Sequence, residues 1–101
     1  MERDRIRAMV ISKATENNID PDLFLRIAKC ESNLNPQAKN KISTASGIFQ
    51  FLNSTFIKQA EAYGIEWSDK NDPEVQAELA ANMIADGGLF HWNASRSCWG
   101  N

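Results

Sequence analysis

The sequence predicts a mainly α-helical protein, folded as a single domain over residues 1–101, with at most a short β element around residues 47–51. Three features indicate this fold class. Apolar residues recur at the three- and four-residue spacing of helices. Asp-Pro pairs at residues 20–21 and 72–73 are typical of helix starts, because a capping carboxylate there precedes a proline. Glycines follow the last two expected helices, where left-handed backbone commonly ends a helix.

The first two helices are expected at residues 2–17 and 21–32. An inward stripe at helical spacing in the first helix consists of Ile6, Met9, Val10 and Ala14. Two asparagines at residues 17–18 end this helix in a turn. Asp20 and Pro21 begin the second helix, and a proline at residue 36 marks a turn beyond its end.

The chain between residues 38 and 51 predicts a loop followed by a short apolar segment. Residues 38–46 are small and polar, which is typical of a loop. Residues 47–51, Gly-Ile-Phe-Gln-Phe, are expected to form a strand or a buried extended piece. We expect Phe49 and Phe51 to lie in the core.

Two further helices are expected at residues 53–63 and 73–86. The residues expected to point inward are Phe56, Ile57, Ala60 and Tyr63 in the first of them and Leu79, Ala80 and Met83 in the second. The side chain of Asn53 or Ser54 is expected to cap the first of these two helices. The segment that begins at Leu89 is expected to add one helical turn and then an irregular tail, docked by its aromatic residues.

The composition argues against several classes of protein. The 101 residues are 43% hydrophobic and 24% charged, which is typical of a globular protein. A net charge of −2 argues against nucleic-acid binding through a general basic field. No apolar run approaches the roughly 18 residues of a membrane-spanning helix. The N-terminal segment has no apolar core of signal-peptide length.

The two cysteines, Cys30 and Cys98, leave two interpretations open. They are either buried thiols of a cytosolic protein or a disulfide of an exported one. A bridge over so long a loop would stabilise a small domain by roughly 4 kcal/mol. A metal site is not expected, because the cysteines lie far apart in sequence and His91 is the single histidine.

Glu31 interrupts the apolar face of the second expected helix. Phe24, Ile27 and Ala28 form an inward stripe, and Glu31 occupies its next position, at the C-terminal end of the helix. In that place burial and the helix dipole would both raise the pKa of the carboxyl group. Such a carboxyl group can hold a proton near neutral pH and act as a general acid. The alternative, that the helix has ended and Glu31 points to water, stays open from periodicity alone.

Two neighbouring segments form a recognisable pair of motifs. Residues 30–38 read Cys-Glu-Ser-Asn-Leu-Asn-Pro-Gln-Ala, and residues 45–51 read Ala-Ser-Gly-Ile-Phe-Gln-Phe. They resemble the E-S-x-x-x-P-x-A and Gly-apolar-apolar-Gln segments of the lytic transglycosylase and goose-type lysozyme-like family. Over residues 18–85 the resemblance implies a lysozyme-like helical fold. It also implies cleavage of the β-1,4 bond between N-acetylmuramic acid and N-acetylglucosamine in peptidoglycan.

The resemblance assigns roles to five residues by motif position. It implies that Glu31 is the single catalytic acid and that Ser32 supports it. Ser46, Gly47 and Gln50 match the motif that lines the substrate cleft. Gly47 would let the backbone approach a sugar, and Gln50 would offer a donor and an acceptor to an acetamido group or to the carboxyl.

The implied reaction needs only one carboxyl group and no cofactor. Glu31 would protonate the glycosidic oxygen and then, as a carboxylate, take the proton from the muramyl C6 hydroxyl, which attacks C1 and leaves a 1,6-anhydro sugar. Attack by water would instead make the protein a hydrolytic lysozyme, with Asp69 or Asp72 as a second carboxylate. We expect the anhydro product, because Glu31 is the only acid in the two motifs and a tethered hydroxyl has a high effective concentration. Asp72 itself is expected to cap a helix.

The region after the fourth helix departs from the family. Many members carry a tyrosine there that hydrogen-bonds the catalytic acid, whereas residues 90–93 read Phe-His-Trp-Asn. His91 is therefore a candidate partner of Glu31 and of the substrate. The alternative for His91 is an ordinary packing or surface histidine.

The end of the chain, with Trp92, Cys98 and Trp99, resembles small secreted wall-lytic domains, including resuscitation-promoting-factor-like ones. This resemblance favours a disulfide between Cys30 and Cys98. The implied partner is a peptidoglycan glycan strand, without nucleic acid or a membrane span, and the chain is expected to be bacterial and monomeric. We expect it to act outside the cytoplasm, as an excised domain of an exported protein or as a phage or secretion-system enzyme. The alternatives are a catalytically silent glycan-binding module and a small helical DNA-binding or interaction domain.

Overall fold

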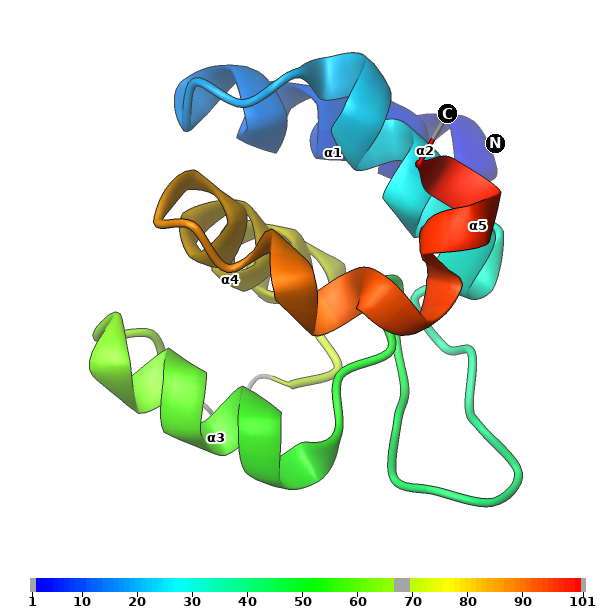
Figure 1. Cartoon of the computed structure of the whole chain (residues 1–101), viewed down its shortest axis with the longest axis vertical. Coiled ribbons are helices and arrows are strands. Elements are labelled where there is room, and N and C mark those ends of the chain that lie inside the picture. The colour runs from blue at the N-terminus through cyan, green and yellow to red at the C-terminus, as the bar shows by residue number, and fades with distance from the viewer. Residues whose placement is uncertain (1, 67–69, 101) are drawn as a thin grey trace.

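Helices make up most of residues 2–66 and 70–100, the parts of the chain that the computed structural model describes (Figure 1). In chain order they are α1 (Glu2–Glu16), α2 (Pro21–Ser32), α3 (Asn53–Ala62), α4 (Pro73–Ala85), the 3-10 helix η2 (Leu89–Ser95) and α5 (Arg96–Trp99). The predicted mainly α-helical fold class is confirmed.

The two Asp-Pro pairs begin helices as predicted. The Asp20 carboxylate accepts a hydrogen bond from the Asp22 amide at 3.0 Å, and α2 begins at the next residue, Pro21. The Asp72 carboxylate likewise accepts from the Glu74 amide at 2.9 Å at the start of α4. Each bond satisfies one of the amides that the first turn of a helix leaves without a partner.

The prediction that the side chain of Asn53 or Ser54 caps α3 is wrong. Leu52 occupies the capping position and makes no side-chain bond, and Asn53 is already the first helical residue. The Asn53 side chain accepts a hydrogen bond from the Lys70 ammonium at 2.5 Å. A contact with a residue distant in sequence therefore replaces the local cap that the sequence suggested.

The core lies between α1, α2 and α4, with α3 packed against α4 on the other side (Figure 1). Helix α1 contacts both α2 and α4, so it joins these two helices around the apolar residues. The buried residues include most of those predicted to point inward, namely Ile6, Val10, Ala14, Phe24, Ile27, Ala28, Phe56, Leu79 and Met83.

Residues 47–51 form a tight turn instead of a strand. The backbone amides and carbonyls of Ser46 and Phe51 bond to each other in both directions at 3.1 Å, which closes the turn. Gln50 adopts left-handed backbone at φ 54°, which an extended segment does not contain. The burial of Phe49 and Phe51 is as predicted. Within the described ranges the β structure consists of isolated bridges at this turn and its neighbours.

The C-terminal segment is helical where the sequence predicted an irregular tail. Helices η2 and α5 follow each other directly from Leu89 to Trp99. Trp92 and Trp99 are each only 4% exposed, so docking by aromatic residues is as expected. Helix α5 is too short to be stable alone, and its contact with α2 supplies the packing that holds it (Figure 1). Over the described part of the chain, no helix has the length and apolar character needed to cross a membrane.

Candidate active site

A cavity of about 420 Å³ opens beside the C-terminal end of α2, and Glu31 is part of its wall. The turn after Ser46 contributes Phe49 and Gln50, and η2 contributes His91 and Trp92. Three segments that are distant in sequence therefore surround one carboxyl group. This confirms that Glu31 does not simply point to bulk water, although it is not fully buried either.

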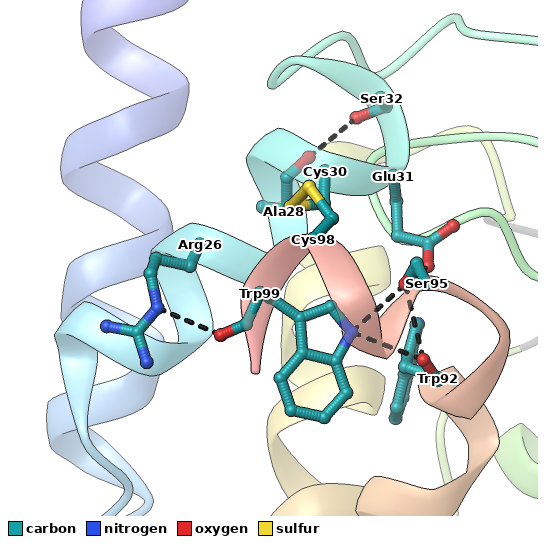
Figure 2. Close-up of a disulfide and its surroundings, with 9 residues drawn as sticks. All are labelled: Arg26, Ala28, Cys30, Glu31, Ser32, Trp92, Ser95, Cys98 and Trp99. Atoms are coloured by element: carbon teal, nitrogen blue, oxygen red, sulfur yellow. Dashed lines mark hydrogen bonds between the residues drawn. A yellow bond between two sulfur atoms is a disulfide. The ribbon is translucent and has the colours of Figure 1, made fainter. Parts of the chain in front are cut away.

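The Glu31 carboxylate accepts a hydrogen bond from the Ser95 hydroxyl at 2.5 Å (Figure 2). Burial raises the pKa of the Glu31 carboxyl above its ordinary value, and the bond from Ser95 acts in the opposite direction. Burial is the larger of the two effects. A carboxyl group in this position holds its proton to a higher pH than an exposed one does, as a general acid requires.

Ser95 is itself held by two tryptophans of the C-terminal segment (Figure 2). The Trp99 indole N–H donates to the Ser95 oxygen at 3.0 Å, and the Trp92 carbonyl oxygen lies 3.2 Å from the same hydroxyl. The hydroxyl has one proton, so it donates either to Glu31 or to the Trp92 carbonyl. The Trp99 indole N–H also lies 3.2 Å from the Trp92 carbonyl oxygen, so its single proton is shared between that oxygen and the Ser95 oxygen. Since the indole can only donate, Ser95 acts as an acceptor towards Trp99 and has its own proton available for Glu31 or the Trp92 carbonyl.

A disulfide between Cys30 and Cys98 holds this segment against α2 (Figure 2). Cys30 directly precedes Glu31, and Cys98 lies in α5, the helix that follows Ser95. The Arg26 guanidinium adds a second link, because its Nε donates to the Trp99 carbonyl at 3.1 Å. The disulfide expected from the family resemblance is therefore present, and it connects the two sides of the Glu31–Ser95 pair.

Of the predicted cleft residues, the structure brings Gln50 and His91 to the same cavity as Glu31. The Gln50 amide nitrogen donates to the carbonyls of Gly47 at 2.9 Å and Ala38 at 3.3 Å. Both of its protons are thus directed to the backbone, and the amide oxygen is the group that Gln50 has left for a ligand.

Ser32 and Gly47 lie behind the cavity wall and not in it. The Ser32 hydroxyl donates to the Ile48 carbonyl at 2.8 Å, which attaches the end of α2 to the turn after Ser46. Gly47 has φ +87°, and a Cβ there would lie 2.8 Å from the Gln76 side chain. The close approach that requires glycine is therefore to Gln76, whereas the sequence suggested an approach to a sugar.

Ser46 lies in a neighbouring hollow of about 360 Å³, together with Lys70. The Lys70 ammonium donates to the Ser46 hydroxyl at 2.7 Å and to the Asn53 side chain. Partial burial lowers the pKa of Lys70. Lys70, which precedes α4, thus joins Ser46 of the polar loop to Asn53 at the start of α3.

Sequence reasoning missed Gln76, which supports the turn from α4. Gln76 is only 2% exposed. Its side-chain oxygen accepts from the Ile48 amide at 2.9 Å, and its nitrogen donates to the Lys70 carbonyl at 3.0 Å. A signal was present, because Gln76 shares the inward stripe of α4 with Leu79 and Met83, as Glu31 shares that of α2.

Of the two interpretations of His91, the structure favours a surface histidine over a hydrogen-bond partner of Glu31. In the described part of the chain the bond to the Glu31 carboxylate comes from Ser95, while His91 is exposed and stacks on Phe90. Asp72 caps α4, as expected, and Asp69 lies outside the described residues. No cluster of three or more metal-binding side chains occurs in residues 2–66 and 70–100.

The family profile described as the transglycosylase SLT domain matches residues 8–87. The chain belongs to this family. The matched part of the SLT domain includes Glu31, Gln50 and Gln76, whereas Ser95 and Cys98 lie beyond it. The partner of Glu31 is therefore contributed by a segment outside the family match.

The SLT domain is similar to curated proteins of Staphylococcus aureus named probable transglycosylase SceD. It is 40% identical over 85 residues to the protein of strain bovine RF122 / ET3-1 and 39% identical over 84 residues to that of strain Mu3 / ATCC 700698. These matches cover 80% of this chain and 36% of each relative, so the chain spans about a third of their length. A comparison with solved structures gives no significant match.

Proposed function

We propose that this SLT domain is a lytic transglycosylase that cleaves the β-1,4 bond between N-acetylmuramic acid and N-acetylglucosamine in peptidoglycan, with Glu31 as its acid and base. The observation that supports this most strongly is the environment of Glu31. It combines a raised pKa, a place in the wall of a cavity and a fixed hydroxyl partner. The family match covers the same residue.

In the proposed reaction Glu31 first protonates the glycosidic oxygen, and the bond from that oxygen to the muramyl C1 breaks. The developing positive charge at C1 is stabilised by the carbonyl oxygen of the substrate's own 2-acetamido group. The Glu31 carboxylate then takes the proton of the C6 hydroxyl, and the oxygen of that hydroxyl forms a bond to C1. Glu31 ends protonated, and the product carries a 1,6-anhydro ring without the addition of water.

Ser95 has a defined part in this cycle as a positioning residue. When Glu31 is a carboxylate, Ser95 donates to its Oε2 atom, so one orientation of the carboxyl group is favoured and the other oxygen faces the substrate. When Glu31 carries its proton, the Ser95 hydroxyl can turn its own proton to the Trp92 carbonyl, 3.2 Å away. In both states the Trp99 indole N–H can donate to the Ser95 oxygen, and its proton is shared between that oxygen and the Trp92 carbonyl oxygen.

The walls of the cavity favour transglycosylation over hydrolysis. Glu31 is the only acidic residue among the described residues that line it. An enzyme that activates water usually places a second carboxylate across the sugar ring. Intramolecular attack by the C6 hydroxyl does not need one.

The proposal has three further parts. Gln50 and His91 contact the glycan strand, and Ser32, Ser46 and Gly47 hold the wall on which Gln50 lies. Residues 1–101 act as one catalytic domain and as a monomer. Because its substrate is the cell wall, the domain works outside the cytoplasm.

The test is the loss of turbidity of a purified peptidoglycan suspension. We expect the native chain to clear the suspension and Glu31→Gln to be slower by roughly 10²- to 10⁴-fold, the usual cost of losing a general acid. Glu61→Gln, which removes the same charge from an exposed position on α3, is the matched control and should clear it at the native rate. If Glu31→Gln keeps more than half of the native rate, the assignment fails. If no variant clears the suspension but all bind it, the domain is a glycan-binding module.

A further inference from the structure

Phe90 is an exposed aromatic side chain beside the proposed active site. It is 62% exposed, although burial of such a side chain is normally favourable. One face of its ring stacks on His91, with the ring centres 4.3 Å apart and the planes 27° apart. The His91 ring in turn packs edge-to-face against the ring of buried Trp92, with the ring centres 6.1 Å apart. A row of three rings therefore leads from the core to the surface, and Phe90 is its outer end.

Phe90 borders a second hollow, of about 180 Å³, at the end of α4. The far wall of this hollow comes from α3, through Gln59 and Tyr63, and from Asp86. His91 lines both this hollow and the cavity that contains Glu31. The two hollows are therefore neighbours that share His91 as a lining residue, and Phe90 lies on the side away from the Glu31 cavity.

The second hollow combines groups suited to a sugar ring. A pyranose has an apolar face of C–H bonds and an edge of hydroxyl groups. The Phe90 ring offers an apolar, electron-rich face. Gln59 supplies an amide, and the Tyr63 hydroxyl donates to the Asp86 carboxylate at 2.9 Å, which keeps two more polar groups at the rim. An apolar surface with a few fixed polar groups is typical of a small-molecule subsite.

We propose that the glycan strand extends from the Glu31 cavity over His91, and that Phe90 binds a further sugar ring of the same strand in the second hollow. This inference rests on the proposed function. The occupant is a sugar and not a protein segment, because the hollow is small, has polar groups at its rim and shares His91 with the cavity at which we propose that the strand is cut.

Binding of peptide-free glycan fragments of alternating N-acetylglucosamine and N-acetylmuramic acid tests the inference. The measurements use titration calorimetry with Glu31→Gln protein, which does not cut the ligand. A tetrasaccharide and an octasaccharide are compared. Adding Phe90→Ala should weaken octasaccharide binding by about tenfold, the upper range for a lost aromatic contact. Tetrasaccharide binding should change much less, and Phe90→Tyr should restore octasaccharide affinity.

The matched control is Ile42→Ala, which removes another exposed apolar side chain, 94% accessible, from the loop after Ala38. It should leave the affinity for both fragments unchanged. Since Phe90 is exposed, its replacement should not unfold the domain, and thermal unfolding verifies this for each variant.

Unchanged octasaccharide affinity in Phe90→Ala overturns the inference. An equal loss for both fragments overturns it as well, because Phe90 would then belong to the catalytic cavity itself. Failure of the proposed function has a different signature, in which the native chain does not clear peptidoglycan or the Glu31→Gln protein binds neither fragment. Clearing of peptidoglycan together with an unaffected Phe90→Ala variant rejects the further sugar subsite alone.

Discussion

Ser95 and Glu31 are 64 positions apart in the chain, yet the Ser95 hydroxyl donates to the Glu31 carboxylate at 2.5 Å. Three features bring them together, namely the Cys30–Cys98 disulfide, the Trp99 indole and the bond from Arg26 to the Trp99 carbonyl. Ser95 lies after residue 87, where the family match ends. Residues 90–93, where many members of the family are expected to carry a tyrosine, contain none, and the bond to Glu31 comes instead from Ser95, two residues further along the chain.

Ser95→Ala should slow peptidoglycan cleavage by about tenfold, the cost of one hydrogen bond to a charged group. It should also move the pH profile. The bond from Ser95 favours the carboxylate and so lowers the pKa of Glu31. Without it the pKa rises, Glu31 stays protonated to a higher pH, and the alkaline limb of kcat/KM shifts upward. The measurement is kcat/KM as a function of pH on soluble glycan strands.

Two variants separate this positioning role from a general effect on folding. Ser95→Thr keeps a hydroxyl and should retain the native alkaline limb. Ser97→Ala removes an exposed hydroxyl from the same segment and should change neither rate nor profile. An alkaline limb that stays in place in Ser95→Ala would contradict the role given to this residue.

Loss of the Cys30–Cys98 disulfide should destabilise the domain by roughly 2–5 kcal/mol, because the bridge restricts a long loop of the unfolded chain. Activity should fall too, since Ser95 depends on the segment that the bridge holds. Denaturant unfolding of a Cys30→Ser, Cys98→Ser double variant measures the first effect, and peptidoglycan clearing well below its unfolding midpoint measures the second. Rapid alkylation of both thiols in native protein without reductant would refute the bridge.

The sequence predicted those parts of the fold that depend on local signals. The Asp20 and Asp72 caps and the inward stripes of α2 and α4 follow from the chemistry of neighbouring residues. The turn at residues 47–51 could not be predicted in this way, because Ile48, Phe49 and Phe51 are apolar enough for a strand. The hydrogen bond from the Ile48 amide to Gln76 is not a local interaction. The helical tail was missed for the same reason, since it depends on contacts with α2.

For the site, the sequence indicated the acid but not its support. Glu31 stood out because it interrupts an apolar stripe, and the same rule applied to α4 would have found Gln76. Ser95 has no such signal, since it lies in a segment whose helical form is set by distant contacts. His91 was one candidate partner by its chemistry, but its ring is exposed and stacks on Phe90, in line with the alternative of a surface histidine.

The stability of the domain should depend on pH through Glu31. Burial raises the pKa of this carboxyl in the folded state, so the folded chain binds more protons than the unfolded chain at pH values between the two pKa values. The stabilisation is complete below the unfolded value of about 4.3 and is lost as the pH rises through the folded value. Glu31→Gln should therefore gain stability relative to the native chain between pH 4 and pH 7.

Denaturant unfolding at both pH values measures this difference, with the exposed Glu61→Gln variant as the charge-matched control. The free energy of unfolding of Glu31→Gln should exceed that of the native chain by more at the higher pH than at the lower pH. The difference in unfolding free energy between Glu61→Gln and the native chain should not grow in this way. If the difference in unfolding free energy between Glu31→Gln and the native chain becomes smaller at the higher pH, the folded protein stabilises the charged carboxylate instead of the protonated acid.

Gly47→Ala should be clearly more destabilising than Gly64→Ala. Both glycines have positive φ, at +87° and +70°, so both substitutions carry the same kind of backbone strain. A Cβ at Gly47 meets the Gln76 side chain at 2.8 Å, whereas nothing lies within 4 Å of one at Gly64. The extra cost of overpacking is about 1–3 kcal/mol. Equal losses of unfolding free energy in the two variants would show that Gln76 moves away freely.

Mass spectrometry of digested peptidoglycan tests the central claim most directly, namely that Glu31 alone serves as acid and base for attack by the C6 hydroxyl. An anhydro end is lighter than a hydrolysed end by one water and cannot be reduced by borohydride. We expect muropeptides with 1,6-anhydromuramic ends from the native chain and from Glu61→Gln, and almost none from Glu31→Gln. Predominantly hydrated, reducible ends from the native chain would contradict the account, because they would require a second group that activates water.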